Sequence, residues 1–369
     1  MHVRIAAIAT LVVAIAAIYF GSPWTEPPIG SPSLRNVTEY STEPIDANAI
    51  KPVRETLVKL VNYGESSQHV LSGQSAGHIA GNDLTQMHYR TWVRLTKFRD
   101  QPAPAVMSFD MGLSEFPRNT AVVRELAKKH VEAGGIVTVS MHPSNPWTDG
   151  PYDEMTHGSF EDLVTSGKLA NKRYLKSLDQ AAKVLSDLQE QGTPVLWRPL
   201  HEANGDWFWW CAGGSDAALT PRQYKELWNF TYEYLQTKHK LHNLLWVYCA
   251  NAKTYPQILP LQELYPGDKT VDIVGLDYYG PDIKELNKEG CYDAAVATGK
   301  IVALCEFGSK PMDGSLNAKR WVSDMQKHFP RISYFVFWHS WKNSLVALAD
   351  LDEVEEIAKG DYVHYLEDQ

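Results

Sequence analysis

Eight short apolar runs recur along this chain from residue 69 onward, and each is followed by a polar tip and a longer amphipathic stretch. The runs occupy residues 69–77, 103–112, 134–143, 193–202, 243–251, 271–280, 300–309 and 332–341. Their nearly continuous apolar character is typical of strands buried on both faces of a parallel sheet. Eight strand–helix units of this kind predict an α/β fold of the (β/α)8 TIM-barrel type.

The stretches between the runs have the character of helices. Residues 121–134 and 173–192 are amphipathic and end at a glycine, which is a common helix stop, and residues 220–240 open with Thr-Pro, a typical helix start. A doubly wound sheet is the alternative fold. It would use fewer strands and a glycine-rich phosphate turn near its start, and the sequence has no such turn. We therefore predict a single catalytic domain over residues 49–369.

The N-terminal segment differs from the rest of the chain. One arginine precedes an apolar run over residues 5–20, which is short for a membrane span but suits the core of a secretory signal. We predict a signal peptide or N-terminal anchor over residues 1–22, and a linker over residues 23–48, which are rich in Pro, Ser, Thr and Glu. A secreted or periplasmic location follows, with a stable membrane partner only if the segment is retained.

Charge and cysteine content narrow the classes of partner and cofactor. A formal net charge of −9 and the lack of a basic stripe argue against a nucleic-acid partner. The four cysteines, Cys211, Cys249, Cys291 and Cys305, show neither a CxxC motif nor cysteine–histidine pairs at zinc spacing. We expect no metal or cofactor, a monomer, and at least two free buried thiols, while the three ways of pairing the four cysteines stay open.

Polar or aromatic residues end seven of the eight runs, where a core would favour apolar side chains. They are Asp110, His142, Glu202, Asn251, Tyr279, Glu306 and Trp338. In a (β/α)8 barrel the chemistry gathers at the carboxyl ends of the strands. This end of the barrel is therefore the predicted active site.

Two of these residues are carboxylates on different strands. Glu202 ends the fourth run and Glu306 lies in the otherwise apolar "ALCEFG" of the seventh, where an unpaired charge would be costly to bury. Cleavage of a glycosidic bond needs such a pair, one acid to protonate the leaving oxygen and one carboxylate to attack or to activate water. The alternative is that each glutamate pairs with a basic side chain in the upper barrel.

The residues around Glu202 offer possible partners. If the fourth strand stays regular, alternation places Arg198, Leu200 and Glu202 on one face and His201 on the other. Arg198 would then either hold a carboxylate ionised or form a salt bridge in the barrel floor, and both interpretations stay open. His201 and His142 are candidates to bind the glutamates or a sugar hydroxyl.

Tryptophans follow Glu202 in the stretch "RPLHEANGDWFWW" (198–210). Indole rings can stack on the apolar faces of sugars, but they can equally pack in a core. We expect one or two of Trp207, Trp209 and Trp210 to contact ligand, with Trp207 the best candidate, and the others to pack beneath the loop. Trp147, in "HPSNPWTDG", has the same two interpretations.

The stretch 198–210, together with "VDIVGLDYYG" and "LCEFG", resembles glycoside hydrolase family 26, whose best-known members are secreted endo-β-1,4-mannanases. The resemblance covers about residues 50–365. It implies a retaining double displacement in which Glu202 is the general acid/base and Glu306 the nucleophile. It also implies that His201 orients the acid, that Tyr279 bonds the nucleophile, and that His142, Trp207 and Trp338 contact sugars.

One position departs from the family pattern. Many mannanases of the family carry arginine directly after the tryptophan of the last strand, where this chain has His339. The predicted function is hydrolysis of mannan, glucomannan or galactomannan. Hydrolysis of β-1,3-xylan or mixed-linkage β-glucan, and a non-catalytic glycan-binding barrel, are the alternatives.

Overall fold

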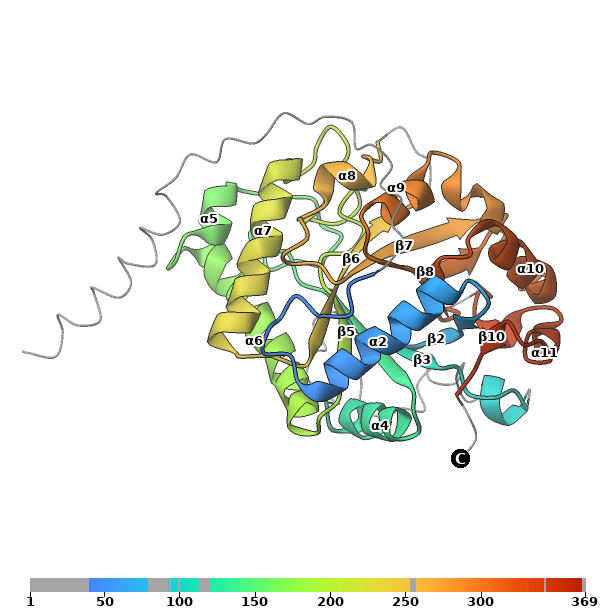
Figure 1. The fold of residues 1–369 in the computed structure, drawn as a ribbon. Helices are drawn as coiled ribbons and strands as arrows, with labels where there is room; N and C mark the ends of the chain where they lie inside the picture. The colour runs from blue at the N-terminus through green and yellow to red at the C-terminus, as the bar shows by residue number, and fades with distance from the viewer. Residues whose placement is uncertain are drawn as a thin grey trace, which may run out of the picture. The chain divides into compact units, whose positions relative to one another are not determined.

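Eight parallel strands form a closed barrel in the computed structural model, which describes residues 40–78, 92, 94–98, 100–112, 120–252, 257–341 and 343–366 (Figure 1). The strands are β2 (Gly73–His78), β3 (Val106–Gly112), β4 (Ile136–His142), β5 (Val195–Arg198), β6 (Leu244–Asn251), β7 (Ile273–Gly280), β8 (Ile301–Ser309) and β9 (Ile332–Phe337). Neighbours in the chain pair in parallel, and β9 closes the ring by pairing with both β8 and β2. The predicted (β/α)8 fold is confirmed, and each predicted run overlaps one barrel strand.

Two short strands extend one side of the barrel. The first predicted run divides into β1 (Val70–Leu71) and β2, and β1 pairs with β9 and with β10 (Val363–His364) near the chain's end. Between β1 and β2, Ser72 donates its N–H and its hydroxyl to the carbonyl of His364. Strand β10, near the end of the chain, is therefore hydrogen-bonded to β1 and to the residue that follows it.

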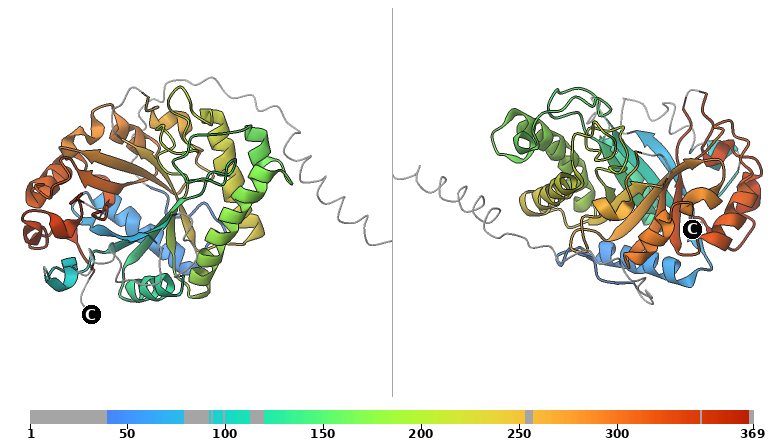
Figure 2. Two further views of the ribbon diagram at one scale, coloured as in Figure 1. Left: turned by 180° about the vertical axis from the view of Figure 1, so that it is seen from behind. Right: turned by 90° about the horizontal axis from the view of Figure 1, so that it is seen from above.

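Helices surround the barrel in both views of Figure 2. They are α2 (Lys51–Ser66), α4 (Thr120–Glu132), α5 (Phe160–Val164), α6 (Leu169–Glu190), α7 (Pro221–Glu233), α8 (Leu261–Leu264), α9 (Cys291–Ala297), α10 (Ala318–His328) and α11 (Val354–Ile357). Three of these confirm the helices predicted from the sequence: α4, α6 and α7. Thr220 caps α7 through a reciprocal capping box with Gln223, as the Thr-Pro start indicates.

Strand alternation separates two layers of core. On β4 the outward side chains Val137, Val139 and Met141 belong to the cluster that packs under the helices, whereas Ile136 belongs to the cluster inside the barrel. At the alternate positions toward the carboxyl end the residues become polar, ending in Ser140 and His142. The barrel interior is thus apolar at the amino end of the strands and polar at the carboxyl end, where the predicted site residues lie.

Helix α2 covers the apolar end of the barrel (Figure 1). Its buried side chains share a cluster with residues of the barrel interior such as Leu196, Leu245 and Ile273. The buried α2 side chains of this cluster are Val53, Leu57, Leu60 and Val61. Burying each such side chain stabilises the fold by about 1.5–3 kcal/mol, so α2 is an integral part of the barrel domain.

The packed domain begins earlier than the predicted residue 49. Residues 40–48 lie in the predicted linker, yet the Tyr40 side chain is buried and its hydroxyl accepts a bond from Nε of Arg331 at 2.8 Å. The N–H of Ile45 donates to Asp272 at 2.8 Å, and Asp46 lies 2.8 Å from Nδ1 of His242. The domain therefore starts no later than Tyr40, because its polar groups find partners on the barrel.

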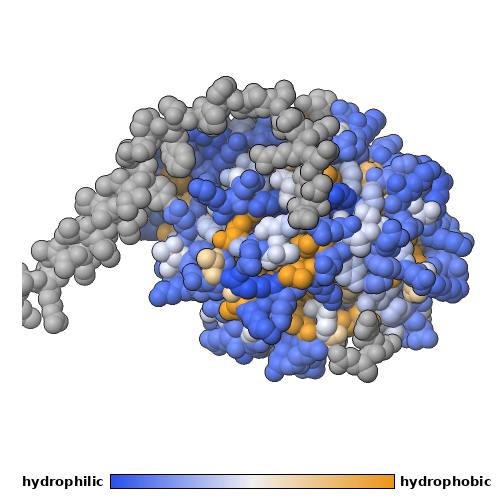
Figure 3. Space-filling model, viewed as in Figure 1, coloured by the Kyte–Doolittle hydropathy of each residue, from blue (hydrophilic) through white to orange (hydrophobic). Residues whose placement is uncertain are grey.

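The predicted signal or anchor over residues 1–22, and the linker up to residue 39, lie outside the described residues. Among the helices that the structure describes, none has the length and apolar character needed to cross a membrane. The face shown in Figure 3 is largely hydrophilic with scattered hydrophobic residues. Within the described ranges, the large hydrophobic side chains that are exposed are Val58, Leu169 and Leu345.

Candidate active site

Glu306 reaches the barrel interior because β8 contains a bulge. In the pairing of β7 with β8, Leu276 is opposite Leu304 and Asp277 is opposite Glu306, so Cys305 is the extra residue. Simple alternation would place Cys305 and Glu306 on opposite faces. The bulge instead turns both inward: Cys305 belongs to the interior cluster, and Glu306 binds Arg198 across the barrel.

Glu202 reaches the site through an irregular turn, which corrects the prediction of a regular fourth strand. Strand β5 ends at Arg198, and the backbone φ angles of Leu200 and Glu202 are +49° and +54°, in the left-handed region. Leu200 consequently packs in the outer core, while Nε2 of His201 comes to 4.0 Å from Glu306 Oε1. The predicted alternation is wrong beyond Arg198, and both His201 and Glu202 face the site.

Arg198 connects three strands beneath the site. Its Nη1 donates to Asp277 Oδ2 at 2.9 Å and its Nη2 donates to Glu306 Oε1 at 2.5 Å, while the side chain is only 1% exposed. Burial alone would lower the pKa of Arg198, but Asp277 and Glu306 raise it well above its usual value. Arg198 therefore forms a salt bridge in the barrel floor with both carboxylates, as one of its two interpretations predicts, and its effect on the ionisation of a carboxylate stays a prediction.

Glu202 is held on both carboxyl oxygens. The side-chain amide of Asn251 donates to Oε1 at 2.6 Å, and the indole N–H of Trp207 donates to Oε2 at 2.8 Å. Burial and the nearby charge of Glu306 raise the pKa of Glu202 from 4.5 to about 7, against the hydrogen bonds from Asn251 and Trp207. A carboxyl group with this pKa can give and take a proton near neutral pH.

Tyr279 completes the surroundings of Glu306. Its hydroxyl donates to Glu306 Oε2 at 2.9 Å, the contact that the family resemblance implies. Burial, and then the charge of Glu306, raise the pKa of Tyr279 well above 10, so the phenol stays protonated and remains a donor. Glu306 thus accepts one bond on each oxygen, from Arg198 and from Tyr279.

Two histidines line the same region. The rings of His142 and His201 stand edge to face with centroids 4.6 Å apart. Burial, and then Arg198, lower the pKa of His201 well below 6.5, so this ring is neutral. His142 is 9% exposed, and its Nδ1 lies 2.9 Å from both oxygens of Asp110 on β3.

The tryptophans around the site differ in burial and in hydrogen-bond partners. Trp207 is half-buried beside Glu202, whereas Trp209 and Trp210 are fully buried and donate their indole N–H groups to the carbonyls of Pro143 and His201. Trp147 packs edge-on against Trp209, with ring centroids 5.7 Å apart, and donates to the carbonyl of Ser159. The structure therefore places Trp147 against the underlying Trp209 and brings only Trp207 of this group onto a carboxylate.

Trp338 and His339 follow β9. Trp338 is 9% exposed, and its backbone N–H donates to the carbonyl of Phe307. His339 is buried, with Nδ1 3.1 Å from the hydroxyl of Ser75. The residue that stands in place of the family's arginine is thus an imidazole packed against β2.

All four cysteines are unpaired: Cys211, Cys249 and Cys305 are buried and Cys291 is partly exposed. Cys249 and Cys305 lie on either side of Gly275, where a Cβ would be 2.8 and 2.5 Å from their sulfur atoms. In the part of the chain that the structure describes, no group of three or more His, Cys, Asp or Glu side chains has an arrangement that could hold a metal ion.

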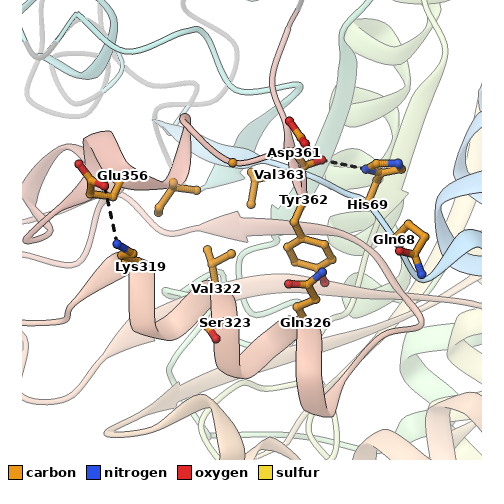
Figure 4. A pocket seen from close by; sticks show the side chains of 12 residues that line it. Gln68, His69, Lys319, Val322, Ser323, Gln326, Glu356, Asp361, Tyr362 and Val363 are labelled. Atoms are coloured by element: carbon orange, nitrogen blue, oxygen red, sulfur yellow. Dashed lines mark hydrogen bonds and ion pairs between the residues drawn. The ribbon is translucent and has the colours of Figure 1, made fainter.

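A separate hollow of about 620 Å³ lies on the flank of the barrel, between α10, α11 and the segments that lead into β1 and β10 (Figure 4). Tyr362 lies beside α10 there, and Lys319 faces Glu356 across 3.8 Å. His69 binds the carbonyl of Asp361. No residue predicted for the active site lines this hollow.

Sequence reasoning missed part of the site. Asn251 and Asp110 were recognised as strand-end residues but not as site residues, and Asp277 was not singled out at all. Asp277 could have been found, because alternation along β7 places it on the same face as Tyr279. The partner of each carboxylate depends on the bulge and the turn, which the pattern does not reveal.

Comparison with known proteins agrees with this geometry. The model of glycosyl hydrolase family 26 matches residues 45–359. A mannan endo-1,4-beta-mannosidase of Bacillus subtilis strain 168 is 28% identical over 318 residues, covering 80% of this chain and 84% of the relative. The mannan endo-1,4-beta-mannosidase A and B of Caldalkalibacillus mannanilyticus is 34% identical over 212 residues, which are 56% of this chain and 40% of that relative's length.

A solved structure of a Bacillus subtilis mannanase superposes with a TM-score of 0.74 at 25% identity, covering 88% of this chain and 95% of the other. The family match spans most of the chain, including Glu202, Glu306 and the strands that carry them. The chain belongs to glycosyl hydrolase family 26.

Proposed function

We propose that this chain is a retaining endo-β-1,4-mannanase that cleaves mannan, glucomannan or galactomannan. The observation that carries the proposal is a buried cluster of two carboxyl groups. In it Glu306 accepts hydrogen bonds from Arg198 and Tyr279. Burial and the charge of Glu306 raise the pKa of Glu202 to about 7. Glu306 thereby accepts a hydrogen bond on each of its oxygens, and Glu202 can give and take a proton near neutral pH. Relatives named mannan endo-1,4-beta-mannosidase support the choice of substrate.

The first step forms a covalent intermediate. A carboxylate oxygen of Glu306 attacks the anomeric carbon, the glycosidic C–O bond breaks, and the proton of Glu202 passes to the leaving oxygen. Glu202 is then a carboxylate, which the N–H donors of Asn251 and Trp207 stabilise. In the second step Glu202 takes a proton from water, the resulting hydroxide oxygen bonds to the anomeric carbon, and Glu306 is released as a carboxylate.

The remaining predicted site residues surround these two steps. We assign contacts with the sugar to His142, Trp207 and Trp338. His142 ends β4 beside Asp110, Trp207 binds Glu202, and Trp338 directly follows β9. His201 lies between His142 and Glu306 and stays neutral, so it can form a hydrogen bond with Glu306 or with the sugar without adding a positive charge to the site. Trp147 packs against Trp209 and so supports the loop that follows Glu202.

A panel of polysaccharides tests the proposal. We expect release of reducing ends from mannan, glucomannan and galactomannan, and a loss of about four or more orders of magnitude for Glu306→Ala, because no nucleophile remains. Preferential release from β-1,3-xylan or mixed-linkage β-glucan would contradict the substrate assignment. Binding of galactomannan without release by the unaltered chain would favour a non-catalytic glycan-binding barrel.

Azide separates the roles of the two glutamates. In Glu202→Ala, azide can replace water in the second step and give the β-glycosyl azide from an activated aryl substrate. In Glu306→Ala, azide can replace the missing nucleophile and give the α-anomer. The opposite assignment of products would exchange the two roles.

We also propose that the protein is exported, on the basis of the apolar run over residues 5–20. Fractionation of the producing cell, with the N-terminal sequence of the recovered protein, tests this. Recovery of activity in the cytoplasm with residues 1–22 intact would contradict export.

A further inference from the structure

Asp110 is fully buried at the carboxyl end of β3, directly across from β4. Its carboxylate accepts from the hydroxyl of Ser140 and lies with both oxygens 2.9 Å from Nδ1 of His142. Asp110 therefore contacts His142, one of the residues predicted to bind sugar.

A carboxylate only accepts hydrogen bonds, so Nδ1 of His142 must carry the proton that points at Asp110. The other ring nitrogen, Nε2, is then directed away from Asp110. The His142 ring is held on its remaining sides by Tyr152 and Phe208, with centroids 4.8 and 5.2 Å away. Asp110 thus selects the tautomer and, together with Tyr152 and Phe208, holds the orientation of the ring.

The oriented ring connects to the chemistry through His201. The two imidazoles stand edge to face at 86°, and Nε2 of His201 is 4.0 Å from Glu306 Oε1. His201 Nδ1, which is buried, has no hydrogen-bond partner among the residues that the structure describes. The His201 ring is therefore positioned by packing, against His142 at 4.6 Å and against Phe208 and Trp210 at 5.5 and 6.0 Å between centroids.

We propose that Asp110 is a positioning residue for the hydrolytic reaction, acting through His142 by fixing its Nδ1–H tautomer and its ring orientation in the cleft. The proposal rests on the proposed function. A carboxylate that holds a histidine in one tautomer contributes to catalysis without touching the substrate, and loss of such orientation costs about 10²-fold in rate for displacements near 1 Å.

A double-mutant cycle with Asp110→Asn and His142→Ala tests it on an activated aryl β-mannoside. Asp110→Asn keeps the side-chain volume but removes the charge, and we expect kcat/KM to fall about 10- to 100-fold, mainly through kcat. In the His142→Ala background the same substitution should change kcat/KM by less than about threefold, because its target is gone. Multiplicative losses in the double variant would overturn the proposal.

Two further measurements separate positioning from folding. Ser140→Ala removes a different hydrogen bond to the same carboxylate and leaves His142 in place, so its loss of kcat should be far smaller than that of Asp110→Asn. An equal loss would mean that Asp110 acts as a structural support, and would contradict the proposal.

Nitrogen NMR of ¹⁵N-histidine protein reports the tautomer without any substrate. We expect His142 to be protonated on Nδ1 in the unaltered chain and to populate the Nε2–H form in Asp110→Asn. An unchanged tautomer would refute the positioning role even if mannan hydrolysis is confirmed. A chain that shows the tautomer change but hydrolyses no β-mannan would instead refute the proposed function alone.

Discussion

The side-chain amide of Asn251 donates to Oε1 of Glu202 across 2.6 Å and so joins the end of β6 to the acid delivered after β5. This bond favours the ionised form of Glu202 and opposes the burial that raises its pKa to about 7. The pKa of Glu202 is therefore the result of opposing contributions, and replacing a single neighbouring side chain should change it.

Asn251→Ala should raise the pKa of Glu202, because the hydrogen bond that it removes lowers that pKa. The alkaline limb of the kcat/KM profile, which reports the general acid of the free enzyme, should move to higher pH. A full pH–rate profile checks this, with the exposed Asn48→Ala as the matched control. A limb that moves to lower pH would contradict the claim that the hydrogen bond from Asn251 lowers the pKa of Glu202.

Glu202→Gln should change how stability depends on pH. Since the pKa of Glu202 is about 7 in the folded protein and 4.5 ordinarily, its contribution to stability is fully present below about pH 4.5 and is lost as pH rises through about 7. The glutamine variant lacks this loss. Its free energy of unfolding relative to the unaltered chain should therefore be higher at about pH 8 than at about pH 4, as measured by urea titration. A difference independent of pH would contradict the raised pKa.

Arg198→Met should destabilise the fold by about 3–5 kcal/mol, because it leaves Asp277 and Glu306 buried without their cation. Adding Asp277→Asn should recover part of this stability but not the activity, since Glu306 still lacks its partner. Arg222→Met, which breaks an exposed pair with Glu226, is the control and should cost about 0.5 kcal/mol or less. Equal losses for the two arginine variants in chemical denaturation would argue against a buried ion-pair network.

Gly275→Ala should cost about 1–3 kcal/mol through overpacking, since the new methyl group would lie 2.5 Å from the Cys305 sulfur and 2.8 Å from that of Cys249. In a background of Cys249→Ala and Cys305→Ala, which lacks both sulfur atoms, Gly275→Ala should cost less, because the nearest remaining atom of the two is the Cβ of residue 249 at 3.2 Å. Gly360→Ala, where no neighbour lies closer than 4.0 Å, is the matched control. The unfolding midpoint in urea measures each variant.

The sequence predicted the barrel because its signals are repeated. Each of the eight apolar runs separately indicates a strand that is buried on both faces. If one strand were predicted wrongly, the other seven would still indicate the barrel. Glu202 and Glu306 could likewise be recognised as a pair from their motifs and their places at strand ends. Those signals are local in the chain and need no knowledge of geometry.

The arrangement of the site could not be predicted in the same way. Alternation fails at Leu200 and Glu202, where the backbone is left-handed, and at Cys305, the extra residue of the β8 bulge. Each irregularity moves the side chains that follow it to the opposite face of the strand from the one that alternation predicts, and the pattern of apolar residues does not show where this happens. The sequence also predicts too late a start for the domain, because residues 40–48 have the composition of a linker although Tyr40 is buried and binds Arg331.

Proton NMR of the first products from β-1,4-manno-oligosaccharides tests the central claim most directly, because it follows the anomeric carbon on which Glu306 and Glu202 are proposed to act. A double displacement predicts that the β-anomer appears first and that the α-anomer accumulates only later by mutarotation. Initial release of the α-anomer would show a single displacement by water and would contradict the roles assigned to both glutamates.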